Sequence, residues 1–318
     1  MATMVNTVNG PISVDELGIT LMHEHITYAD WGMRENFGHR FCQKDLIADA
    51  AVERFNRLKQ YGVKTIVDAS VPNIGRDVSL IKEVSERTGL NFIVSSGFYY
   101  QQEPYLEYRP EDQIYQLLRE ECEKGIVDTN IYPGIMKAAS GPNGLDDYTI
   151  KLHRAIGRVA ADLNLPIFCH HNPLSKCGGQ IIDILEEVCV PANKIILGHT
   201  GDSNDIEYIE SLLKRGCYIG MDRFGYCDMG NNLENRVNTI ANLVDKGYAN
   251  QMFLSHDLAV FMGVYDYWPE FVKNELFHPN VDYTFLFEKA IPALKEKGVN
   301  DQTILEMLQN NPRDIFKG

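Results

Sequence analysis

The chain alternates strictly between short apolar runs and longer amphipathic stretches, and this alternation limits the fold more than any other feature. Each of eight apolar runs has the length of a strand and is followed by residues with helical periodicity. Strand–helix alternation requires parallel strands joined by right-handed crossovers, and eight such units favour a closed (β/α)8 TIM barrel over an open sheet. The expected strands are residues 19–25, 63–70, 92–99, 134–139, 166–170, 194–199, 218–223 and 252–257.

No linker, low-complexity tract or internal repeat interrupts the chain, so residues 1–318 are expected to form a single domain. A further helix at 301–309, ending before Asn311-Pro312, is expected to plug one end of the barrel. The expected helices between the strands are residues 45–60, 78–87, 111–123, 146–163, 179–188, 205–215, 233–245 and 283–296.

Composition and charge exclude several classes of protein. A formal net charge of −14 argues against nucleic acid and anionic membranes as partners, although a local basic pocket stays open. No apolar run is long enough to span a membrane, and residues 1–18 lack the basic and apolar segments of a secretory signal. The seven cysteines are scattered without a CxxC pair, so we expect no disulfide framework and a reducing, cytoplasmic location.

Six metal-binding or ionisable side chains lie near the ends of five expected strands. In such barrels the active site is built at the carboxyl ends of the strands. His23 and His25 are two residues apart on one strand and therefore point to the same side, whereas Glu24 points away. The other strand-end residues are Lys137 on strand four, His170 on strand five, His199 on strand six and Asp257 on strand eight.

Any one of these residues, taken alone, is more often a hydrogen-bonded structural side chain than a ligand. Their occurrence on one face is what predicts a metal site. Imidazole and carboxylate suit Zn²⁺, with Co²⁺, Mn²⁺ and Fe²⁺ as alternatives. Four histidines and an aspartate are too many ligands for one catalytic metal with an open position, but they suit two divalent ions.

Lys137 is the unusual member, because a protonated amine would repel two cations. We therefore expect a neutral or altered lysine, and the hypothesis is a carbamate formed with CO₂, an anionic group that can bridge two metals. Two metals would lower the pKa of a bridging water toward about 7 and generate hydroxide at neutral pH. Asp257 could accept the proton of that hydroxide and pass it to the leaving group.

At these residues the chain resembles the phosphotriesterase family of the amidohydrolase superfamily, and most closely its phosphotriesterase-like lactonase branch. The matching segments are LGITLMHEHI, GIMKAAS, IFCHHNP, IILGHTGDSNDIEYI, YIGMDRFG, FLSHD and NNPRDIF. The resemblance implies that one metal is held by His23, His25 and Asp257 and the other by His170 and His199. It also implies that carbamylated Lys137 bridges them, and that the protein is a homodimer.

Two more positions match the lactonase branch. The resemblance implies that Tyr99 orients a lactone near the metals and that Arg223 holds the substrate loop, although either side chain could be structural. His171 and Lys176 follow strand five and could receive an anionic substrate group, with a solvated loop as the alternative. The segment 258–280 is long for a loop after a strand, and long loops are uncommon unless functional. We expect Phe261 and Trp268 in it to form an apolar lid or acyl channel, with a dimer contact as the rival.

The expected function is hydrolysis of acyl-homoserine or other lactones, with promiscuous esterase or phosphotriesterase activity on small-molecule substrates. The alternatives within this class are a phosphorylated sugar lactone hydrolase, a dedicated organophosphate hydrolase and an amidase. A catalytically silent metal-binding protein is the non-enzyme alternative, and the complete set of ligands argues against it.

Overall fold

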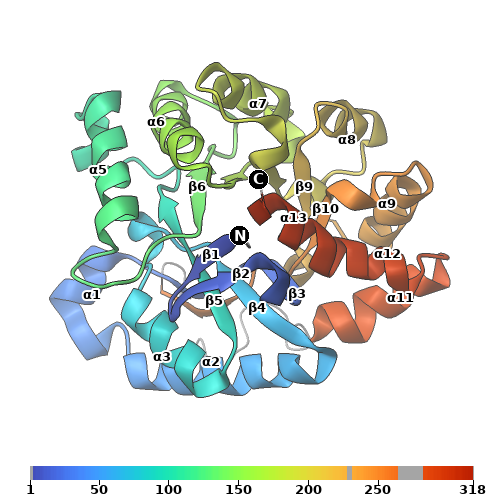
Figure 1. The fold of residues 1–318 in the computed structure, drawn as a ribbon, viewed down its shortest axis with the longest axis horizontal. Coiled ribbons are helices and arrows are strands. Elements are labelled where there is room, and N and C mark those ends of the chain that lie inside the picture. The colour runs from blue at the N-terminus through green and yellow to red at the C-terminus, as the bar shows by residue number, and fades with distance from the viewer. Residues whose placement is uncertain (1–2, 228–230, 264–281, 318) are drawn as a thin grey trace.

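The computed structural model describes residues 3–227, 231–263 and 282–317, which form a parallel α/β barrel (Figure 1). The described part of the barrel has nine strands in the order β10-β9-β8-β7-β6-β5-β4-β3-β11, and every neighbouring pair is parallel. This arrangement confirms the expected fold class. The strands are β3 (Ile19–Tyr28), β4 (Val63–Asp68), β5 (Asn91–Gly97), β6 (Ile135–Ala139), β7 (Ile167–His170), β8 (Ile195–Gly198), β9 (Tyr218–Met221), β10 (Met252–Leu254) and β11 (Ala259–Met262).

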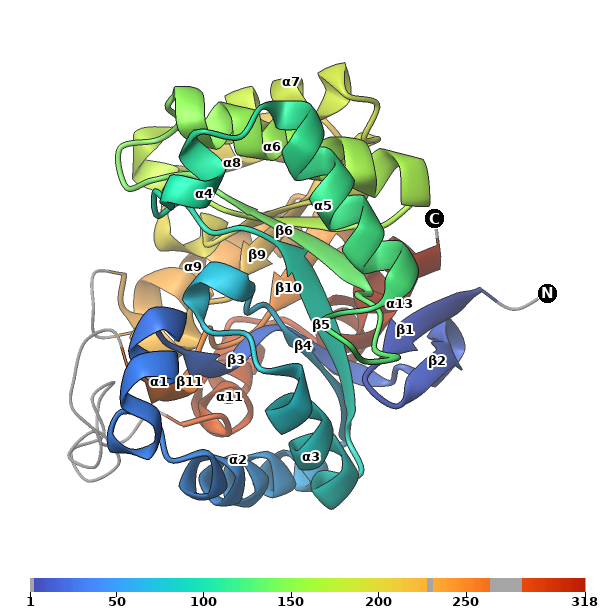
Figure 2. The same cartoon turned by 90° about the vertical axis from the view of Figure 1, so that its left-hand side faces the viewer.

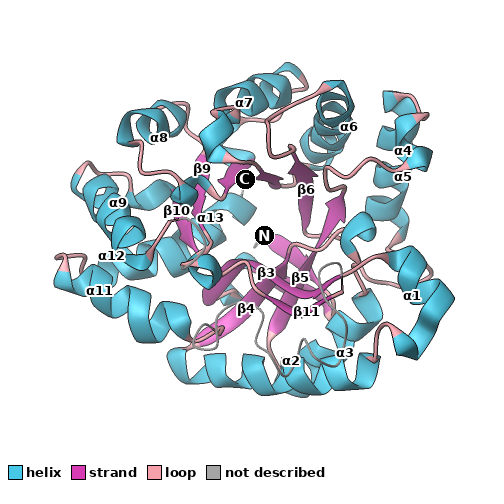
Figure 3. Cartoon of the chain, turned by 180° about the vertical axis from the view of Figure 1, so that it is seen from behind, coloured by secondary structure: helices cyan, strands magenta, loops and turns pink. Residues whose placement is uncertain are grey.

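Helices surround the sheet on its outer side, as the view from behind in Figure 3 shows. Their inner faces pack on the outward side chains of the strands in one large apolar cluster. Seven of the eight expected helices occur close to their expected bounds, because their apolar faces and end signals are strong. In the segment expected as a helix at 283–296, the α-helix begins only at Ile291, after a wider helical turn at Leu286–Ala290. The helices are α1 (Trp31–Phe37), α2 (Lys44–Leu58), α3 (Val78–Thr88), α4 (Pro104–Glu107), α5 (Glu111–Lys124), α6 (Asp147–Leu163), α7 (Gly178–Glu187), α8 (Ile206–Leu213), α9 (Leu233–Asp245), α11 (Ile291–Glu296), α12 (Asp301–Leu305) and α13 (Asn311–Lys317).

The barrel closes through a last strand that is split into two pieces. β10 pairs with β9, whereas β11, four residues further on, pairs with β3 in the register Ala259↔His25 and Met262↔Tyr28. The expectation that residues 258–280 form one loop is therefore wrong for its first part. For the same reason β3 is three residues longer than expected and does not end at His25.

A second apolar cluster fills the barrel interior and the end opposite to the carboxyl ends of the strands. It contains inward side chains such as Met22, Val67 and Phe253, together with Ile315 and Phe316 from α13. The hairpin of β1 (Met4–Thr7) and β2 (Gly10–Ser13) covers the same end, where both chain ends lie (Figure 2). The side chains from the C-terminal segment in this cluster thus come from α13, which follows the helix at 301–309 that was expected to plug one end of the barrel.

The C-terminal helical path is longer than expected. It runs from α12 through a wider helical turn at Glu306–Asn310 into α13, so Asn311-Pro312 does not end it. Pro312 lies in the first turn of α13, where the missing N–H of proline costs little. Within the described residues no helix has the length and apolarity needed to cross a bilayer. The seven cysteines are all free.

Candidate metal centre

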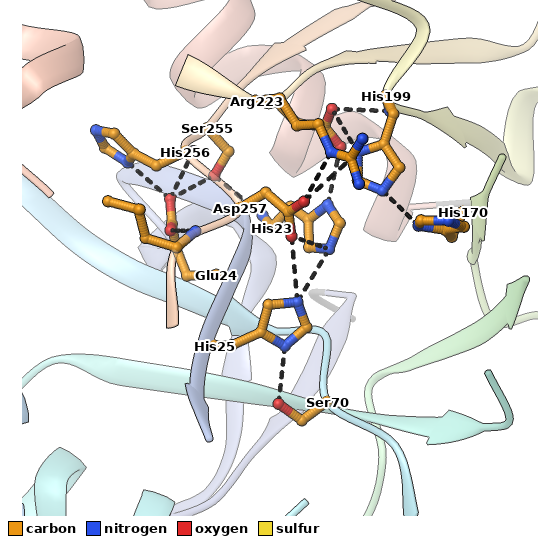
Figure 4. A network of polar contacts seen from close by, with 12 residues as sticks. His23, Glu24, His25, Ser70, His170, His199, Arg223, Ser255, His256 and Asp257 are labelled. Atoms are coloured by element: carbon orange, nitrogen blue, oxygen red, sulfur yellow. Dashed lines mark hydrogen bonds and ion pairs between the residues drawn. The ribbon is translucent and has the colours of Figure 1, made fainter. Parts of the chain in front are cut away.

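The side chains predicted from the strand ends converge at the carboxyl end of the barrel (Figure 4). His23 and His25 point to the same side of β3, and their Nε2 atoms are 3.3 Å apart. Asp257, which follows β10, places its Oδ1 3.1 Å from Nε2 of His23 and 3.3 Å from Nε2 of His25. Three potential ligand atoms from two ends of the sequence thus face one point.

A second group lies beside the first. His170 ends β7 and His199 follows β8, and Nδ1 of His170 is 2.7 Å from Nε2 of His199. Asp257 lies between the two groups, because its Oδ2 is 3.8 Å from Nδ1 of His199. His23, His199 and Asp257 can each offer a ligand atom within 4.8 Å of the others, which is the spacing of a metal site.

Lys137 points into the centre from β6. Its Nζ lies 3.1 Å from Nε2 of His23 and 4.3 Å from the centre of the Phe168 ring. Burial lowers the pKa of Lys137 from 10.5 to about 8, although the nearby Asp257 acts in the opposite direction. A lysine in this position carries its charge less readily than a surface lysine, as an amine that reacts with CO₂ requires.

Asp222, at the end of β9, holds two of the histidines from behind. Its Oδ2 is 2.9 Å from Nδ1 of His23, and its Oδ1 is 2.8 Å from the backbone N and 3.3 Å from Nδ1 of His199. Burial alone would raise the pKa of Asp222, but His199 and His23 hold it well below its usual value. An ionised carboxylate only accepts hydrogen bonds, so Nδ1 of both histidines must carry the proton.

His25 is held in the same way by a hydroxyl group. Oγ of Ser70 donates to the carbonyl of Thr27 at 3.0 Å and therefore accepts from Nδ1 of His25 at 2.9 Å. Metal-binding histidines commonly donate their outer N–H to such a partner, which fixes the tautomer and the ring orientation.

The donor set fits divalent metal ions. Because Nδ1 of His23 and of His25 carries the proton, their Nε2 atoms turn unprotonated lone pairs toward each other and toward Oδ1 of Asp257. The unprotonated Nε2 of His199 faces Nδ1 of His170. Burial lowers the pKa of His23 to about 3 and that of His170 well below its usual value, so these rings stay neutral. Converging lone pairs repel unless a cation lies among them, and neutral imidazole with carboxylate is the ligand set of zinc and related metals.

Two of these residues have backbone conformations that residues other than glycine rarely adopt. His199 and Asp257 have φ angles of 63° and 59°, in the left-handed region. Such conformations cost free energy and persist where the surrounding structure holds them, often at functional sites. In both residues the turn directs the side chain into the centre at the point where the strand ends.

Tyr99 and Arg223 lie at the edge of the centre, on different sides. Oη of Tyr99 is 3.2 Å from Nε2 of His170. Arg223 donates from Nε to Oδ2 of Asp257 at 3.0 Å and from Nη1 to Asp202 at 2.8 Å, and Asp202 also pairs with Arg236 at 2.6 Å. Both residues are thus near the candidate ligands, and their contact with substrate stays a prediction.

The other expected substrate-binding residues lie elsewhere or are engaged. His171 is fully buried, with Nδ1 2.7 Å from the carbonyl of Gly198 and Nε2 3.5 Å from Oη of Tyr208. Lys176 is exposed and donates to Asp205 at 2.8 Å.

Phe261 lies in β11, where it is fully buried and makes an edge-to-face contact with Phe41, instead of in a loop. Trp268 lies outside the described residues. Substrate contact by these four residues remains a prediction.

Sequence reasoning missed Asp222, Ser70 and Asp202. Asp222 carries the same signal that identified Asp257, a carboxylate directly after a buried strand. Ser70 and Asp202 carry no such signal, because small hydroxyl and acidic residues are common in loops after strands.

Comparisons with known proteins show similarity to one family over nearly the whole chain. The model of the phosphotriesterase family matches residues 3–316. The phosphotriesterase homology protein of Mycobacterium tuberculosis is 35% identical over 98% of this chain and 97% of its own. The aryldialkylphosphatase of Saccharolobus solfataricus is 32% identical over 96% of each chain. The phospho-furanose lactonase of Mycoplasmopsis synoviae is 27% identical over 98% of this chain and 90% of its own.

A solved structure has the same fold. The phosphotriesterase from Mycobacterium tuberculosis superposes with a TM-score of 0.90 at 35% identity, covering 99% of this chain and 98% of the other. The agreement in fold therefore extends over nearly the whole of both chains.

Proposed function

The chain belongs to the phosphotriesterase family and is an ester hydrolase, and we propose that it uses two divalent metal ions to hydrolyse uncharged lactones. The observation that carries this proposal is the convergence of His23, His25, His170, His199 and Asp257 at the carboxyl end of the barrel, with the unprotonated Nε2 atoms of His23 and His25 facing the carboxylate.

His23, His25 and Asp257 would hold one ion, and His170 and His199 the other. When bound, the ions, Zn²⁺ or alternatively Co²⁺, Mn²⁺ or Fe²⁺, would lower the pKa of a water molecule and polarise the scissile ester. Asp257 would accept the proton of the attacking water and deliver it to the leaving alkoxide. Its contact with Arg223 keeps that carboxylate oriented during the transfer.

Lys137 would join the two sets of ligands as a carbamate. Its neutral amine forms an N–C bond to CO₂ and releases one proton, which leaves an anionic group with two oxygens. The position of Nζ, 3.1 Å from His23 and fully buried, supports this role, because a cationic lysine there would oppose metal binding.

The edge of the centre suits an uncharged substrate. Tyr28, Tyr99 and Tyr100 form one aromatic wall, with the ring of Tyr99 6.1 Å from Tyr28 and 4.6 Å from Tyr100. Lys176, which was expected to receive an anion, is paired with Asp205, and Arg223 at the edge of the centre is paired with Asp202 and Asp257. A phosphorylated lactone would have to break those pairs. This favours neutral lactones over the phosphorylated substrate that the name of the Mycoplasmopsis relative indicates.

The test is a pH-indicator screen of acyl-homoserine, aliphatic and phosphorylated sugar lactones beside a phosphotriester, with enzyme carrying defined metals. We expect the highest kcat/KM on uncharged lactones, with weaker phosphotriester hydrolysis. A strong preference for the phosphorylated lactone, or for the phosphotriester, would overturn the substrate assignment. Chelation should abolish hydrolysis and added metal should restore it, whereas a silent metal-binding protein would hydrolyse none of these compounds.

Lys137→Ala tests the carbamate. The variant should lose metal bridging and activity, and short carboxylates such as formate or acetate should restore part of both. Density for a carbamate at Lys137 in a metal-loaded crystal would support the assignment, and an unmodified amine away from the metals would contradict it. The homodimer and the cytoplasmic location are also proposals, and sedimentation and fractionation test them.

A further inference from the structure

Glu24 lies between His23 and His25 in sequence but points to the opposite side of β3, away from the metal centre (Figure 4). Its side chain is fully buried, and its carboxylate accepts hydrogen bonds from the segment 255–258. Oε1 accepts from Oγ of Ser255 at 2.8 Å and from the backbone N and Nδ1 of His256 at 2.9 and 2.8 Å. Oε2 accepts from the backbone N of Leu258 at 3.2 Å.

His256 is fixed as a donor in this contact. Its Nε2 accepts from the backbone N of Leu286 at 3.2 Å, so that nitrogen is unprotonated. The proton of the neutral ring is therefore on Nδ1 and is donated to Glu24. The buried carboxylate of Glu24 thus accepts four hydrogen bonds, all of them from residues 255–258. Glu24 is thus a rigid link between β3 and the segment that contains Asp257.

The segment needs such a link, because it has an unusual conformation. Asp257 has a φ of 59° and lies in the gap between β10 and β11, outside both strands. The backbone N of Asp257 donates to the carbonyl of His23 at 3.0 Å, but a left-handed non-glycine residue still costs free energy. The bonds from Glu24 hold the residues on both sides of Asp257, and so they determine where its carboxylate points.

We propose that Glu24 is a positioning residue that acts through Asp257, by holding residues 255–258 in the conformation that directs this carboxylate into the centre. The proposal rests on the proposed role of Asp257 in ester hydrolysis. In this proposal His23 faces the centre as a candidate ligand, and the next residue, Glu24, fixes the position of Asp257.

The imidazoles do not depend on Glu24. His23 and His199 are held by Asp222, and His25 is held by Ser70. Oγ of Ser255 also accepts from the backbone N of His23 at 3.1 Å, but the side-chain contacts of the imidazoles do not include Glu24. Loss of the Glu24 contacts should therefore leave the imidazole contacts in place and change the orientation of Asp257 most. This separates a positioning role from a general role in stability.

The test is a double-mutant cycle between Glu24 and Asp257. Glu24→Gln keeps one acceptor oxygen and loses the bond to Leu258, whereas Glu24→Ala loses all four bonds. We expect kcat to fall about 10- to 100-fold in the alanine variant and less in the glutamine variant, with little change in KM. In the Asp257→Asn background the same substitutions should change kcat by no more than about twofold, because the carboxylate that Glu24 positions is absent.

A second readout does not depend on activity. In the metal-free protein, hydrogen exchange of the amides of His256 and Leu258 should speed up in both Glu24 variants, and this measurement remains available if Glu24→Ala folds poorly. The matched control is Lys194→Met. Lys194 is also buried and also binds backbone, donating to Ile315 at the other end of the barrel, so its variant should not speed exchange at 256–258.

The outcomes separate the two proposals. Normal turnover in Asp257→Asn would overturn the role of Asp257 itself. Low turnover in Asp257→Asn with a full additional loss from the Glu24 substitutions would overturn the positioning role only. Unchanged exchange at 256–258 in Glu24→Gln and Glu24→Ala would also overturn it.

Discussion

Arg223 donates from its Nε to Oδ2 of Asp257 at 3.0 Å, so the two oxygens of this carboxylate have different surroundings. Oδ2 faces the guanidinium, whereas Oδ1 faces the Nε2 atoms of His23 and His25. One oxygen is therefore placed among the candidate ligands, and the other is beside a fixed positive charge.

Asp257→Asn should lower turnover by about 10²-fold or more, the range that general acid–base groups contribute, while much of the metal stays bound. The amide keeps the size of the side chain but cannot accept the proton. Steady-state kinetics and elemental analysis of the metal content measure the two effects. Asp183→Asn, on the exposed outer side of α7, is the control. Near-normal turnover would remove the proton-transfer role.

Asp222→Asn should weaken metal binding about 10- to 100-fold. The amide offers one acceptor instead of two, so His23 and His199 cannot both keep a protonated Nδ1 facing it. Competition with a chelator measures the affinity, and the Asp183→Asn variant again serves as the reference. Equal affinities in the two variants would show that Asp222 does not orient the histidines.

Asn73 should control the position of Tyr99. Its Nδ2 donates to the carbonyl of Tyr99 at 3.1 Å, and its Oδ1 accepts from the backbone N of Tyr99 at 2.8 Å. Asn73→Ala removes both bonds and should raise KM for lactones several-fold, since each bond is worth about 1 kcal/mol.

The effect of Asn73→Ala should largely vanish in a Tyr99→Phe background if it acts through the hydroxyl of Tyr99 on the substrate. Asn9→Ala, which also removes a donor and an acceptor contact but at the hairpin end, is the matched control. Fully additive effects of Asn73→Ala and Tyr99→Phe would argue for a structural role alone.

Substitution of Phe261 or Trp268 by alanine should shift the preference among acyl chain lengths more than it changes turnover of small esters. Phe261 is buried in β11, so its substitution acts through the packing of that strand. A series of lactones with increasing acyl length measures the preference. If all chain lengths respond equally, neither residue belongs to an acyl channel.

Ile315→Ala should lower the free energy of unfolding by about 2–5 kcal/mol, because it leaves a cavity in the cluster that plugs the barrel. Urea unfolding measures the loss, and Leu305→Ala on the partly exposed side of α12 should cost much less. The metal content should be unchanged, since Ile315 lies at the other end of the barrel. A loss of metal in Ile315→Ala would show that the two ends are coupled.

Much of the fold was predictable because the signals are local. His23 and His25 could be assigned to one face from strand periodicity alone, and Asp257 from its place after an apolar run. β11 was missed because its four apolar residues become a strand only by pairing with β3, some 230 residues earlier in the chain. The contact of Lys176 with Asp205 was missed for the same reason, since no local pattern encodes a pairing between two loops.

The hairpin and α13 bring both ends of the chain to the closed face of the barrel, away from the candidate metal ligands (Figure 2). An affinity tag, a fusion partner or a solid support attached at either terminus would therefore leave the route for substrate open. Immobilised enzyme joined through residue 318 should thus keep the kcat/KM of the free protein.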